Sequence, residues 1–428
     1  MRVYKPSDIE WLGEIPQSWE NVSIRSCFTE SNQRCNTDSY PLLSVTIANG
    51  IIYQDDIENK KDISNDDKSN YKIVPLNAVA YNKMRMWQGA VGVNTLTTGI
   101  VSPAYIVAIP NEKILPNFVS YLFKSKIMIS EFDKNSYGLC LDMNNLRYDD
   151  FRNIKIPLPP LQEQKEIAEF LDSKCEKIQN YIDKKQKLIT LLQEKKQALI
   201  NEAVCGRVAC HTERSEVSTT AYKPSGIEYL GLIPHHWEVK KLKHICKINP
   251  QANETLPNNF VYIDLESVIK GQLLKEQVIN KEQAPSRAQR ILQKQDILFQ
   301  LVRPYQRNNY IFNKNGDYVA STGYAQIRTK ECVNFVYYAL LENSFVERVI
   351  LKSTGSNYPA ITSNDFADLK IPLPPLQEQK QIANFLDEKC EKINSVIEKT
   401  KKQIELVKEY KNTLINEAVC GRINLERK

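Results

Sequence analysis

Two clusters of arginine, asparagine and glutamine occupy corresponding places in the two halves of the chain. The first lies in YNKMRMWQGAVGVN, from Tyr81, and the second in LFQLVRPYQRNNYIF, from Leu298. Arginine donates two parallel hydrogen bonds to guanine in the major groove of DNA, and asparagine or glutamine pairs in the same way with adenine. A single surface turn with two arginines is more often simply solvated, but recurrence at one place in both halves favours base recognition. The predicted base-contacting residues are Asn82, Lys83, Arg85, Trp87 and Gln88 in the first half, and Arg303, Tyr305, Gln306, Arg307 and Asn308 in the second.

Hydroxyl-bearing residues follow each cluster at two further corresponding places. Side-chain hydroxyls and backbone N–H groups in turns suit contacts to DNA phosphates, which position a protein without specifying the sequence. The predicted phosphate-contacting residues are Ser102 and Tyr105 against Ser321, Thr322 and Tyr324 at one place, and Tyr137 against Ser356, Asn357 and Tyr358 at the other.

The motifs of enzymes that modify or move DNA are missing from the sequence. Adenine methylation requires an N-P-P or D-P-P motif and a glycine-rich loop for S-adenosylmethionine, and ATP-driven translocation requires GxxxxGK[ST]; the sequence contains none of them. A nuclease is the alternative from another class, and it would use the acids Asp142, Asp149, Asp264 and Glu266, whose spacing matches no recognisable metal-binding set. A purely structural coiled-coil scaffold is a third class, and it gives the arginine and amide clusters no purpose. We therefore expect a DNA-binding chain without catalysis, metal or cofactor of its own.

A duplicated frame carries the clusters. The segment from Ile156 to Arg207 returns from Ile371 to Arg422 with about 36 of 52 positions identical. Similar openers begin the halves, YKPSDIEWLGEIPQSWE from Tyr4 and YKPSGIEYLGLIPHHWE from Tyr222. The inserts between them, residues 21–153 and 239–368, have similar lengths but mostly different residues. A copied frame with divergent inserts is suited to holding two unlike recognition surfaces.

The repeated segment predicts a long helix. Prolines precede each copy, and Gly206 and Gly421 follow the last apolar turn as stop signals. Apolar residues recur at two heptad positions, which is typical of a coiled-coil seam. The predicted seam comprises Leu171, Ile178, Ile182, Ile189, Leu192 and Leu199 in the first copy and Leu386, Ile393, Ile397, Ile404, Val407 and Leu414 in the second. The other copy is the nearest partner for such a stripe, in an antiparallel or a parallel pair; packing of each helix on its own domain is the alternative.

Each insert predicts a mixed α/β domain. Short β-branched and aromatic runs come first, PLLSVTI, AVAYN and IVSPAYIVAI in one insert and FVYIDL, DILFQLV and YVASTGYAQI in the other. One helical pattern follows in each, PNFVSYLFKSKIMISEF and VNFVYYALLENSFVERVIL, and then a polar loop. The order of elements matches although the residues do not.

These boundaries divide the chain into six parts. They are residues 1–156, a first recognition domain with repeat segment 4–20; 157–207, the first helix; 208–221, a polar linker; 222–371, the second recognition domain; 372–422, the second helix; and 423–428, a tail. Cys210 and His211 lie in the linker without a second pair of ligands, so a zinc site is not expected there. Cysteines recur at equivalent helix positions, as apolar residues would, and no run approaches a membrane span, so we expect a reducing cytoplasm. The formal charge of +6 favours nucleic acid only weakly.

The doubled PLPPLQEQKxIAxFLD helix ending in LINEAVCGR, the YKPS openers and the run NKMRMWQGAVGVN…GIVSPAY resemble the specificity subunit of bacterial type I restriction-modification enzymes. The resemblance covers essentially the whole chain. It implies two target recognition domains, each reading one half of a bipartite asymmetric DNA target, on an internal repeat with pseudo-two-fold symmetry. It implies that the two helices form an antiparallel spacer that docks two modification (methyltransferase) subunits, which restriction (translocase and endonuclease) subunits then join. S-adenosylmethionine, ATP and Mg²⁺ would bind those partner subunits. The extra polar tract after Arg207 departs from the family pattern without touching its motifs.

Overall fold

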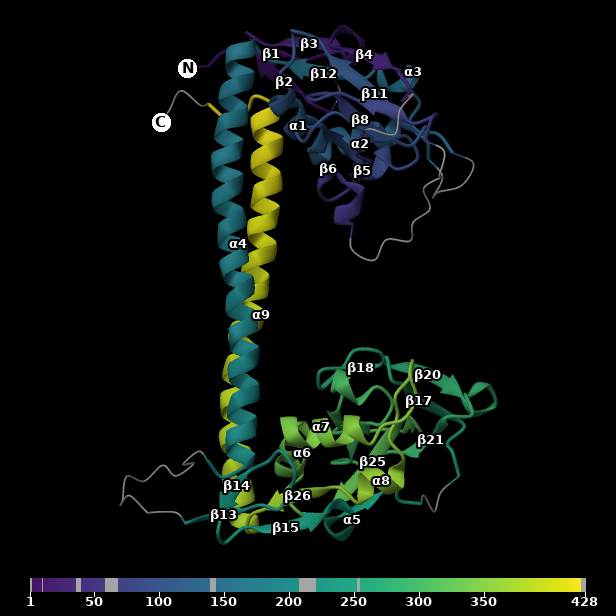
Figure 1. The fold of residues 1–428 in the computed structure, drawn as a ribbon, viewed down its shortest axis with the longest axis vertical. Helices are drawn as coiled ribbons and strands as arrows, with labels where there is room; N and C mark the ends of the chain where they lie inside the picture. Colours follow the sequence, from purple (N-terminus) through teal and green to yellow (C-terminus); the bar gives the residue numbers. More distant parts are fainter. Residues whose placement is uncertain are drawn as a thin grey trace. The chain divides into compact units, whose positions relative to one another are not determined.

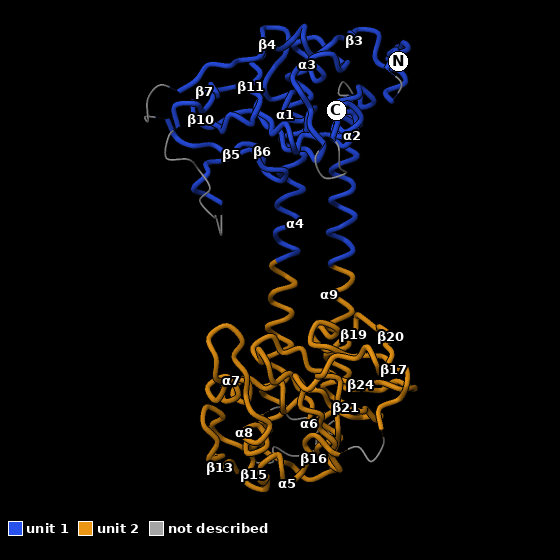
Figure 2. The backbone as a smooth tube through the Cα atoms, turned by 90° about the vertical axis from the view of Figure 1, so that its right-hand side faces the viewer, with its two compact units in different colours: residues 1–186, 401–428 blue, residues 187–400 orange. Residues whose placement is uncertain are grey.

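The structure, a computed structural model, describes residues 2–9, 11–35, 40–57, 68–138, 144–207, 221–251 and 255–424. The chain forms two compact units, unit 1 from residues 1–186 and 401–428 and unit 2 from residues 187–400 (Figures 1 and 2). Each unit contains part of both long helices, so these compact units cut across the sequence-based segments. The predicted linker, with Cys210 and His211, lies outside the described residues apart from Ala221, as does the tail after Asn424.

Short strands and turns make up unit 1 before its long helix. In chain order the elements are β1 (Tyr4–Pro6), β2 (Glu14–Pro16), β3 (Glu20–Ser23), η1 (Ile24–Ser26), β4 (Phe28–Ser31), β5 (Leu43–Thr46), β6 (Gly50–Tyr53), η2 (Gln54–Asp56), β7 (Lys72–Val74), β8 (Val79–Asn82), η3 (Met86–Gln88), β9 (Val91–Val93), β10 (Gly99–Val101), β11 (Tyr105–Pro110), α1 (Pro116–Lys124), α2 (Lys126–Lys134), α3 (Tyr148–Phe151), β12 (Lys155–Leu158) and α4 (Leu161–Val204).

Unit 2 repeats this succession with some extra strands. Its elements are β13 (Tyr222–Pro224), β14 (Leu232–Pro234), β15 (Glu238–Lys241), α5 (Leu242–Ile245), β16 (Cys246–Ile248), β17 (Asn259–Ile263), β18 (Val268–Ile269), β19 (Gln272–Leu273), β20 (Gln277–Asn280), η4 (Lys281–Gln283), β21 (Ala288–Ile291), β22 (Ile297–Gln300), η5 (Pro304–Gln306), β23 (Tyr310–Ile311), β24 (Tyr318–Ser321), β25 (Tyr324–Thr329), α6 (Val333–Leu341), α7 (Asn343–Leu351), α8 (Ser363–Ala367), β26 (Lys370–Leu373) and α9 (Leu376–Val419).

A four-stranded antiparallel sheet with the same strand order lies at the centre of each unit. The order is β4-β11-β8-β9 in unit 1 and β16-β25-β22-β23 in unit 2. Successive residues of the middle strands enter different cores: Val79 packs with the helices, Ala80 packs with the small strands on the other face, and Ile297 and Leu298 divide in the same way. Because both faces are covered, these strands are mostly apolar, as the runs Val79–Tyr81 and Ile297–Phe299 show. The predicted mixed α/β class is thereby confirmed.

Smaller sheets cover the second face of each central sheet. In unit 2 they join as β20-β17-β24-β21, with β17 and β24 parallel. Unit 1 has the pairs β5–β6 and β7–β10, and a parallel bridge between Leu42 and Ile100 lies where β17 meets β24 in unit 2. The repeat in fold therefore extends into the inserts, where the residues have diverged.

Each predicted insert helix is a pair of helices in the structure. The chain is extended at Ser125, between α1 and α2, and at Glu342, between α6 and α7. Ser125 Oγ accepts from the N–H of Met128, and the Glu342 carboxylate accepts from the N–H groups of Ser344 and Phe345. Capping side chains of this kind stabilise a new helix start, so the single helical pattern was wrong in its continuity.

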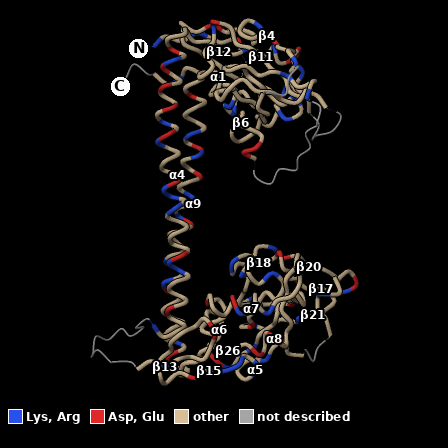
Figure 3. Tube along the Cα trace, viewed as in Figure 1, with Lys and Arg blue, Asp and Glu red and all other residues tan. Residues whose placement is uncertain are grey.

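The predicted long helices are confirmed as α4 and α9, of 44 residues each. Unit 1 packs Ile167 and Leu171 of early α4 with Leu414 and Ala418 of late α9 in one core. Unit 2 packs the late residues of α4 with the early residues of α9, so the two helices are antiparallel. Of the twelve predicted seam residues, seven are buried, five are half-buried and none is exposed. Basic and acidic residues both recur along the length of the two helices (Figure 3).

Repeated polar residues fix the start of each long helix to its own unit. Gln164 is fully buried, donates to the carbonyl oxygens of Lys113 and Pro159, and accepts from the N–H of Leu115. Gln379 likewise donates to the carbonyl oxygen of Pro374 and accepts from the N–H of Cys332, and its other bond goes to the carboxylate of Glu331. The indoles of Trp19 and Trp237 donate to Glu163 and Glu378 at 2.8 and 3.0 Å. These bonds explain why QEQK recurs in both copies, and they show that each helix packs on its own domain as well as on its partner.

The openers close over the helix ends. Gly206 and Gly421 have positive φ, and a Cβ on either would collide with the ring of Pro234 or Pro16, respectively, in the opener of the same unit. Only glycine fits both the left-handed backbone and this close approach. Cys205 and Cys420 are buried beside them, and burial raises the pKa of both thiols to about 12, so they are packing residues. Over the described ranges, no helix is both long enough and apolar enough to span a membrane.

Candidate nucleic-acid interface

The two arginine clusters form equivalent turns at the ends of strands β8 and β22 of the central sheets. Turn A (residues 82–89) follows β8 and contains η3, and turn B (residues 300–308) follows β22 and contains η5. Arg85 and Arg303 each occupy the residue before the 3-10 helix. The correspondence inferred from the sequence therefore has a structural basis, because each cluster follows the equivalent strand of its own unit's central sheet.

Strand register and loop contacts gather the three predicted places within each unit. Asn82 lies opposite Tyr105 in unit 1, and Gln300 lies opposite Tyr324 in unit 2. The third loop joins the turn through the backbone: the N–H of Leu146 donates to Lys83 O at 2.8 Å, and the N–H of Arg303 donates to Pro359 O at 2.7 Å. Each unit thus presents one surface built from the turn and the two loops.

Turn A presents a basic and polar surface. Arg85 and Gln88 are exposed, and Lys83 and Trp87 are half-buried. The Trp87 indole donates to Met84 O at 3.1 Å, and Asn82 Oδ1 accepts from the N–H of Met84 at 3.0 Å. Both side chains therefore stabilise the conformation of turn A. Within this surface Tyr137 is 66% exposed, and Ser102 and Tyr105 are half-buried. Residues 139–143 of the third loop lie outside the described part of the chain.

The predicted contact residues of turn B and its two loops are of two kinds: some are exposed, and others bond to neighbouring parts of unit 2. Tyr305, Gln306, Ser356, Asn357 and Tyr358 are exposed, and Thr322 is half-buried. Arg307 instead donates to Leu341 O at 3.3 Å and to Asn343 Oδ1 at 2.9 Å. Asn308 Oδ1 accepts from the N–H of Lys270 at 3.1 Å. Arg307 and Asn308 therefore hold the turn to its surroundings, a role that sequence reasoning did not assign them.

Two predicted phosphate contacts are corrected by burial. Ser321 is 3% exposed and Tyr324 is fully buried, with its hydroxyl donating to Asp264 O at 3.2 Å. Ser321 is the last residue of β24 and Tyr324 is the first residue of β25, where consecutive residues are buried, and the sequence run YVASTGYAQI did not reveal where these strands end and begin. A phosphate cannot reach these side chains, so they belong to the fold.

The acids of the nuclease alternative are scattered. Asp264 Oδ1 accepts from the hydroxyl of Ser267 at 2.7 Å, Glu266 pairs with Lys275, and Asp149 pairs with Arg152. Asp142 lies outside the described residues. Across the described ranges, no group of three or more histidine, cysteine or acidic residues is arranged to hold a metal ion.

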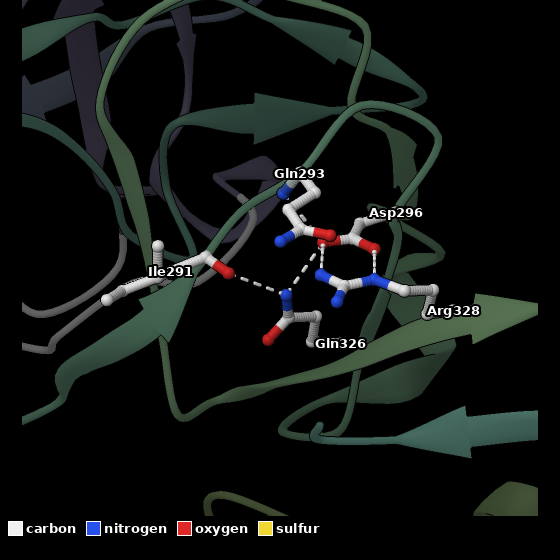
Figure 4. A network of polar contacts seen from close by, with 5 residues as sticks. All are labelled: Ile291, Gln293, Asp296, Gln326 and Arg328. Atoms are coloured by element: carbon white, nitrogen blue, oxygen red, sulfur yellow. Dashed lines mark hydrogen bonds and ion pairs between the residues drawn. The ribbon is translucent and has the colours of Figure 1, made fainter. Parts of the chain in front are cut away.

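A buried carboxylate lies at the start of β22, the strand that leads into turn B (Figure 4). Asp296, directly before β22, is fully buried and receives two hydrogen bonds from the Arg328 guanidinium, both at 2.8 Å. It also accepts from the amide of Gln326 at 2.7 Å and from the N–H of Gln293 at 2.8 Å. This network links the start of β22 to β25, the strand that runs beside it.

One cation anchors turn A to the helix pair. Lys124, the last residue of α1, donates to three carbonyl oxygens: Gly89 in turn A at 3.0 Å, and Ile47 and Thr46 in the β5–β6 turn at 2.7 and 3.2 Å. Leu341, the last residue of α6, receives the bond from Arg307 in unit 2. Both units therefore fix the turn to the end of the first helix, but the cation comes from the helix in one unit and from the turn in the other.

Burial lowers the pKa of Lys124 from its ordinary value of 10.5 to about 8. Between about pH 8 and pH 10.5, Lys124 is protonated in the unfolded chain but has released its proton in the folded chain. The contribution of Lys124 to the free energy of unfolding therefore increases as pH rises through this range. We expect the wild-type protein to gain stability relative to Lys124→Met between about pH 8 and pH 10.5, measured as the difference in urea unfolding midpoints at several pH values. Lys126→Met, at the exposed neighbouring lysine, should show no such trend. A difference that stays flat across this range for Lys124→Met contradicts the prediction.

Comparisons with known proteins agree with this arrangement. The family model described as "Type I restriction modification DNA specificity domain" matches residues 16–191 and 234–406. The sequence is similar to the type I restriction enzyme MjaVIII specificity subunit of Methanocaldococcus jannaschii, at 26% identity over 77% of this chain and 75% of that protein. It is similar to the putative MjaX specificity subunit of the same organism, at 25% identity over 97% of this chain and 96% of that protein.

Solved structures share the fold at low sequence identity. A chain from a study of complex assembly and conformational transition of the type I R-M system superposes with a TM-score of 0.68 at 16% identity, over 96% of this chain and 99% of that chain. The crystal structure of the HsdS subunit from Thermoanaerobacter tengcongensis gives a TM-score of 0.52 at 17% identity, over 96% and 98% of the two chains.

Proposed function

Because the chain belongs to the type I restriction-modification DNA specificity family, we propose that it is the non-catalytic DNA-recognition subunit of such a complex. Each unit reads one half of a bipartite asymmetric target in double-stranded DNA, and α4 and α9 set the spacing between the halves. The helices also dock two modification subunits, and restriction subunits join that core. S-adenosylmethionine, ATP and Mg²⁺ bind those partners, and the complex works in the cytoplasm.

The single observation that supports this most strongly is the pair of equivalent turns with unlike side chains. Turn A offers Arg85 and Gln88, and turn B offers Arg303, Tyr305 and Gln306, each after the equivalent strand of its unit's central sheet. Identical frames with identical side chains would favour a palindromic target, as symmetric dimers do. Identical frames with different side chains favour two different half-sites.

Exposed apolar residues on the long helices support the docking of two equivalent partners. Leu191 of α4 is 51% exposed, and Leu406, its counterpart in α9, is 64% exposed. Tyr181 and Val396 form a second equivalent pair, at 40% and 45%. Apolar side chains that recur on an outer helix surface are typical of positions that a partner protein covers.

Sequencing that detects methylated adenine, in a host carrying this chain with its modification subunits, tests the proposal. We expect one asymmetric motif made of two different half-sites and separated by a gap of unread base pairs. Methylation should disappear when this chain is omitted, although the modification subunits remain. A palindromic motif, or methylation that does not depend on this chain, would overturn the proposal.

Single arginine substitutions should affect one half of the motif each. If Arg85 and Arg303 each donate two hydrogen bonds to a guanine, replacing either with alanine costs about 1–3 kcal/mol and relaxes specificity at one base pair. Arg85→Ala should act on one half-site and Arg303→Ala on the other, measured by binding of the assembled complex to duplexes that vary one position at a time. Arg25→Ala, at an exposed arginine of η1, is the control. Equal weakening on every duplex would show phosphate contacts instead.

A further inference from the structure

Arg303, which is half-buried, has an unusual environment in turn B. Its guanidinium carbon lies over the Tyr358 ring, 4.1 Å from the ring centroid, which is within cation–π range. Its Nε is buried and has no hydrogen-bond partner. In the described part of the chain, no carboxylate forms an ion pair with it. The guanidinium of Arg303 thus contacts an aromatic ring and is not neutralised by a carboxylate.

The backbone around Arg303 is also constrained. Arg303 and Arg307 have φ of +56° and +55°, in the left-handed region that residues other than glycine rarely adopt. Such strain persists where the surrounding structure imposes it, and it is concentrated at functional sites. Here the N–H of Arg303 bonds to Pro359 O, and Val302 and Thr354 each form a bridge with Ala360.

The same bonds fix Tyr358. The loop from Thr354 to Ala360 is anchored at both ends through the backbone, and Gly355 turns it with φ of +104°. The ring is therefore set beside Arg303 by main-chain bonds, while 65% of the residue remains exposed. A ring in this position can limit the rotamers of the arginine without using its own hydroxyl.

We propose that Tyr358 is a specificity-determining residue that acts through Arg303: its ring holds the guanidinium in one plane, so that the terminal NH₂ groups address the O6 and N7 acceptors of one guanine in the half-site of unit 2. This inference rests on the proposed function and deepens it. A mobile arginine contacts any nearby phosphate, whereas a stacked one is pre-organised for the planar edge of a base. Tyr358 is thereby reassigned from a phosphate contact to a positioning residue.

Turn A lacks a described counterpart of this pair. Arg85 is exposed, and the nearby Trp87 directs its indole N–H to Met84 O. The two units therefore use the same turn with a differently supported arginine.

The test uses the assembled complex and duplexes built on the motif found by methylation sequencing, with every base pair of the second half-site varied in turn. Arg303→Lys, which keeps the charge and loses the fork, should reduce discrimination for one G·C pair by about 5- to 150-fold. Tyr358→Ala should reduce discrimination at the same base pair by about 2- to 5-fold. Tyr358→Phe, which keeps the ring, should restore it. Adding Tyr358→Ala to Arg303→Ala should cause no further loss of discrimination at that base pair.

Three outcomes overturn the inference while leaving the proposed function intact. One is full discrimination at every position in Tyr358→Ala. Another is uniform weakening on all duplexes in Tyr358→Phe, which would mark the hydroxyl as a phosphate contact. The third is loss of discrimination at different base pairs in the Tyr358 and Arg303 variants, which would mean that the ring contacts a base itself. Absence of any bipartite methylation by the wild-type complex overturns the proposed function instead.

Discussion

Replacing Ile189 with aspartate is expected to abolish binding to the full bipartite target while both recognition units remain folded. Ile189 is 4% exposed on α4, in the part of the helix that belongs to unit 2. Ile397, a predicted seam residue of α9, is 6% exposed in the same unit. A carboxylate placed in this apolar seam costs several kcal/mol unless it escapes to water, roughly the penalty for an unpaired buried charge. The sheets of each unit and its short helices, α1 and α2 or α6 and α7, do not contain Ile189. The substitution should therefore disrupt the packing of α4 against α9.

The expected loss follows from linkage. If the helices hold two weak half-site binders at one spacing, separate binding of each half-site is far weaker than joint binding. Footprinting with the modification subunits present should therefore show the whole site lost, with weak protection of single half-sites at high protein concentration. Leu188→Asp is the matched control, since it places the same charge one residue away at a position that is 38% exposed. Unchanged footprints and spacer preference in Ile189→Asp would mean that this seam does not set the spacing.

The repeat made the long helices and the paired units predictable from the sequence. Duplication of Ile156 to Arg207 is visible in the letters, and the heptad positions of Ile189 and Ile404 follow from spacing alone. Recurrence of the openers likewise indicated that both halves share a frame, although not that Pro16 and Pro234 pack on the closing glycines.

Details of the binding surface depended on information that the sequence does not contain. Tyr324 and Tyr358 are both tyrosines near polar turns, but one is fully buried on β25 and the other is 65% exposed on a loop. The difference arises because Tyr324 begins a strand of the central sheet, whose two faces are both covered, whereas Tyr358 lies on a loop; residue type alone does not show where the strand begins. Arg307 was predicted to contact bases because residue type does not show that a helix end lies within reach of its guanidinium. Long-range contacts of this kind decide the role of each polar side chain.

Replacing Asp296 with alanine is expected to destabilise unit 2 and to remove recognition of its half-site. The carboxylate is fully buried and accepts four hydrogen bonds, from Arg328, Gln326 and Gln293 (Figure 4). Its loss leaves the Arg328 guanidinium without its acceptor between β22 and β25, and the Gln326 amide keeps only its bond to Ile291 O. Breaking a buried ion pair typically costs about 3–5 kcal/mol, and because the Arg328 side chain is 33% exposed the lower part of that range applies.

The position of Asp296 turns this loss of stability into a loss of function. Asp296 directly precedes β22, and β22 leads into turn B. Displacement of β22 would therefore move Arg303 away from the major groove of the bound DNA. Urea unfolding monitored in the full chain should show unit 2 unfolding at lower denaturant, with unit 1 unchanged. Methylation sequencing of the complex should show a relaxed second half-site beside an intact first one. Asp317→Ala, at an exposed aspartate just before β24, is the control. Because the two units have separate cores, equal damage to both half-sites would show that the network supports the whole chain and not turn B.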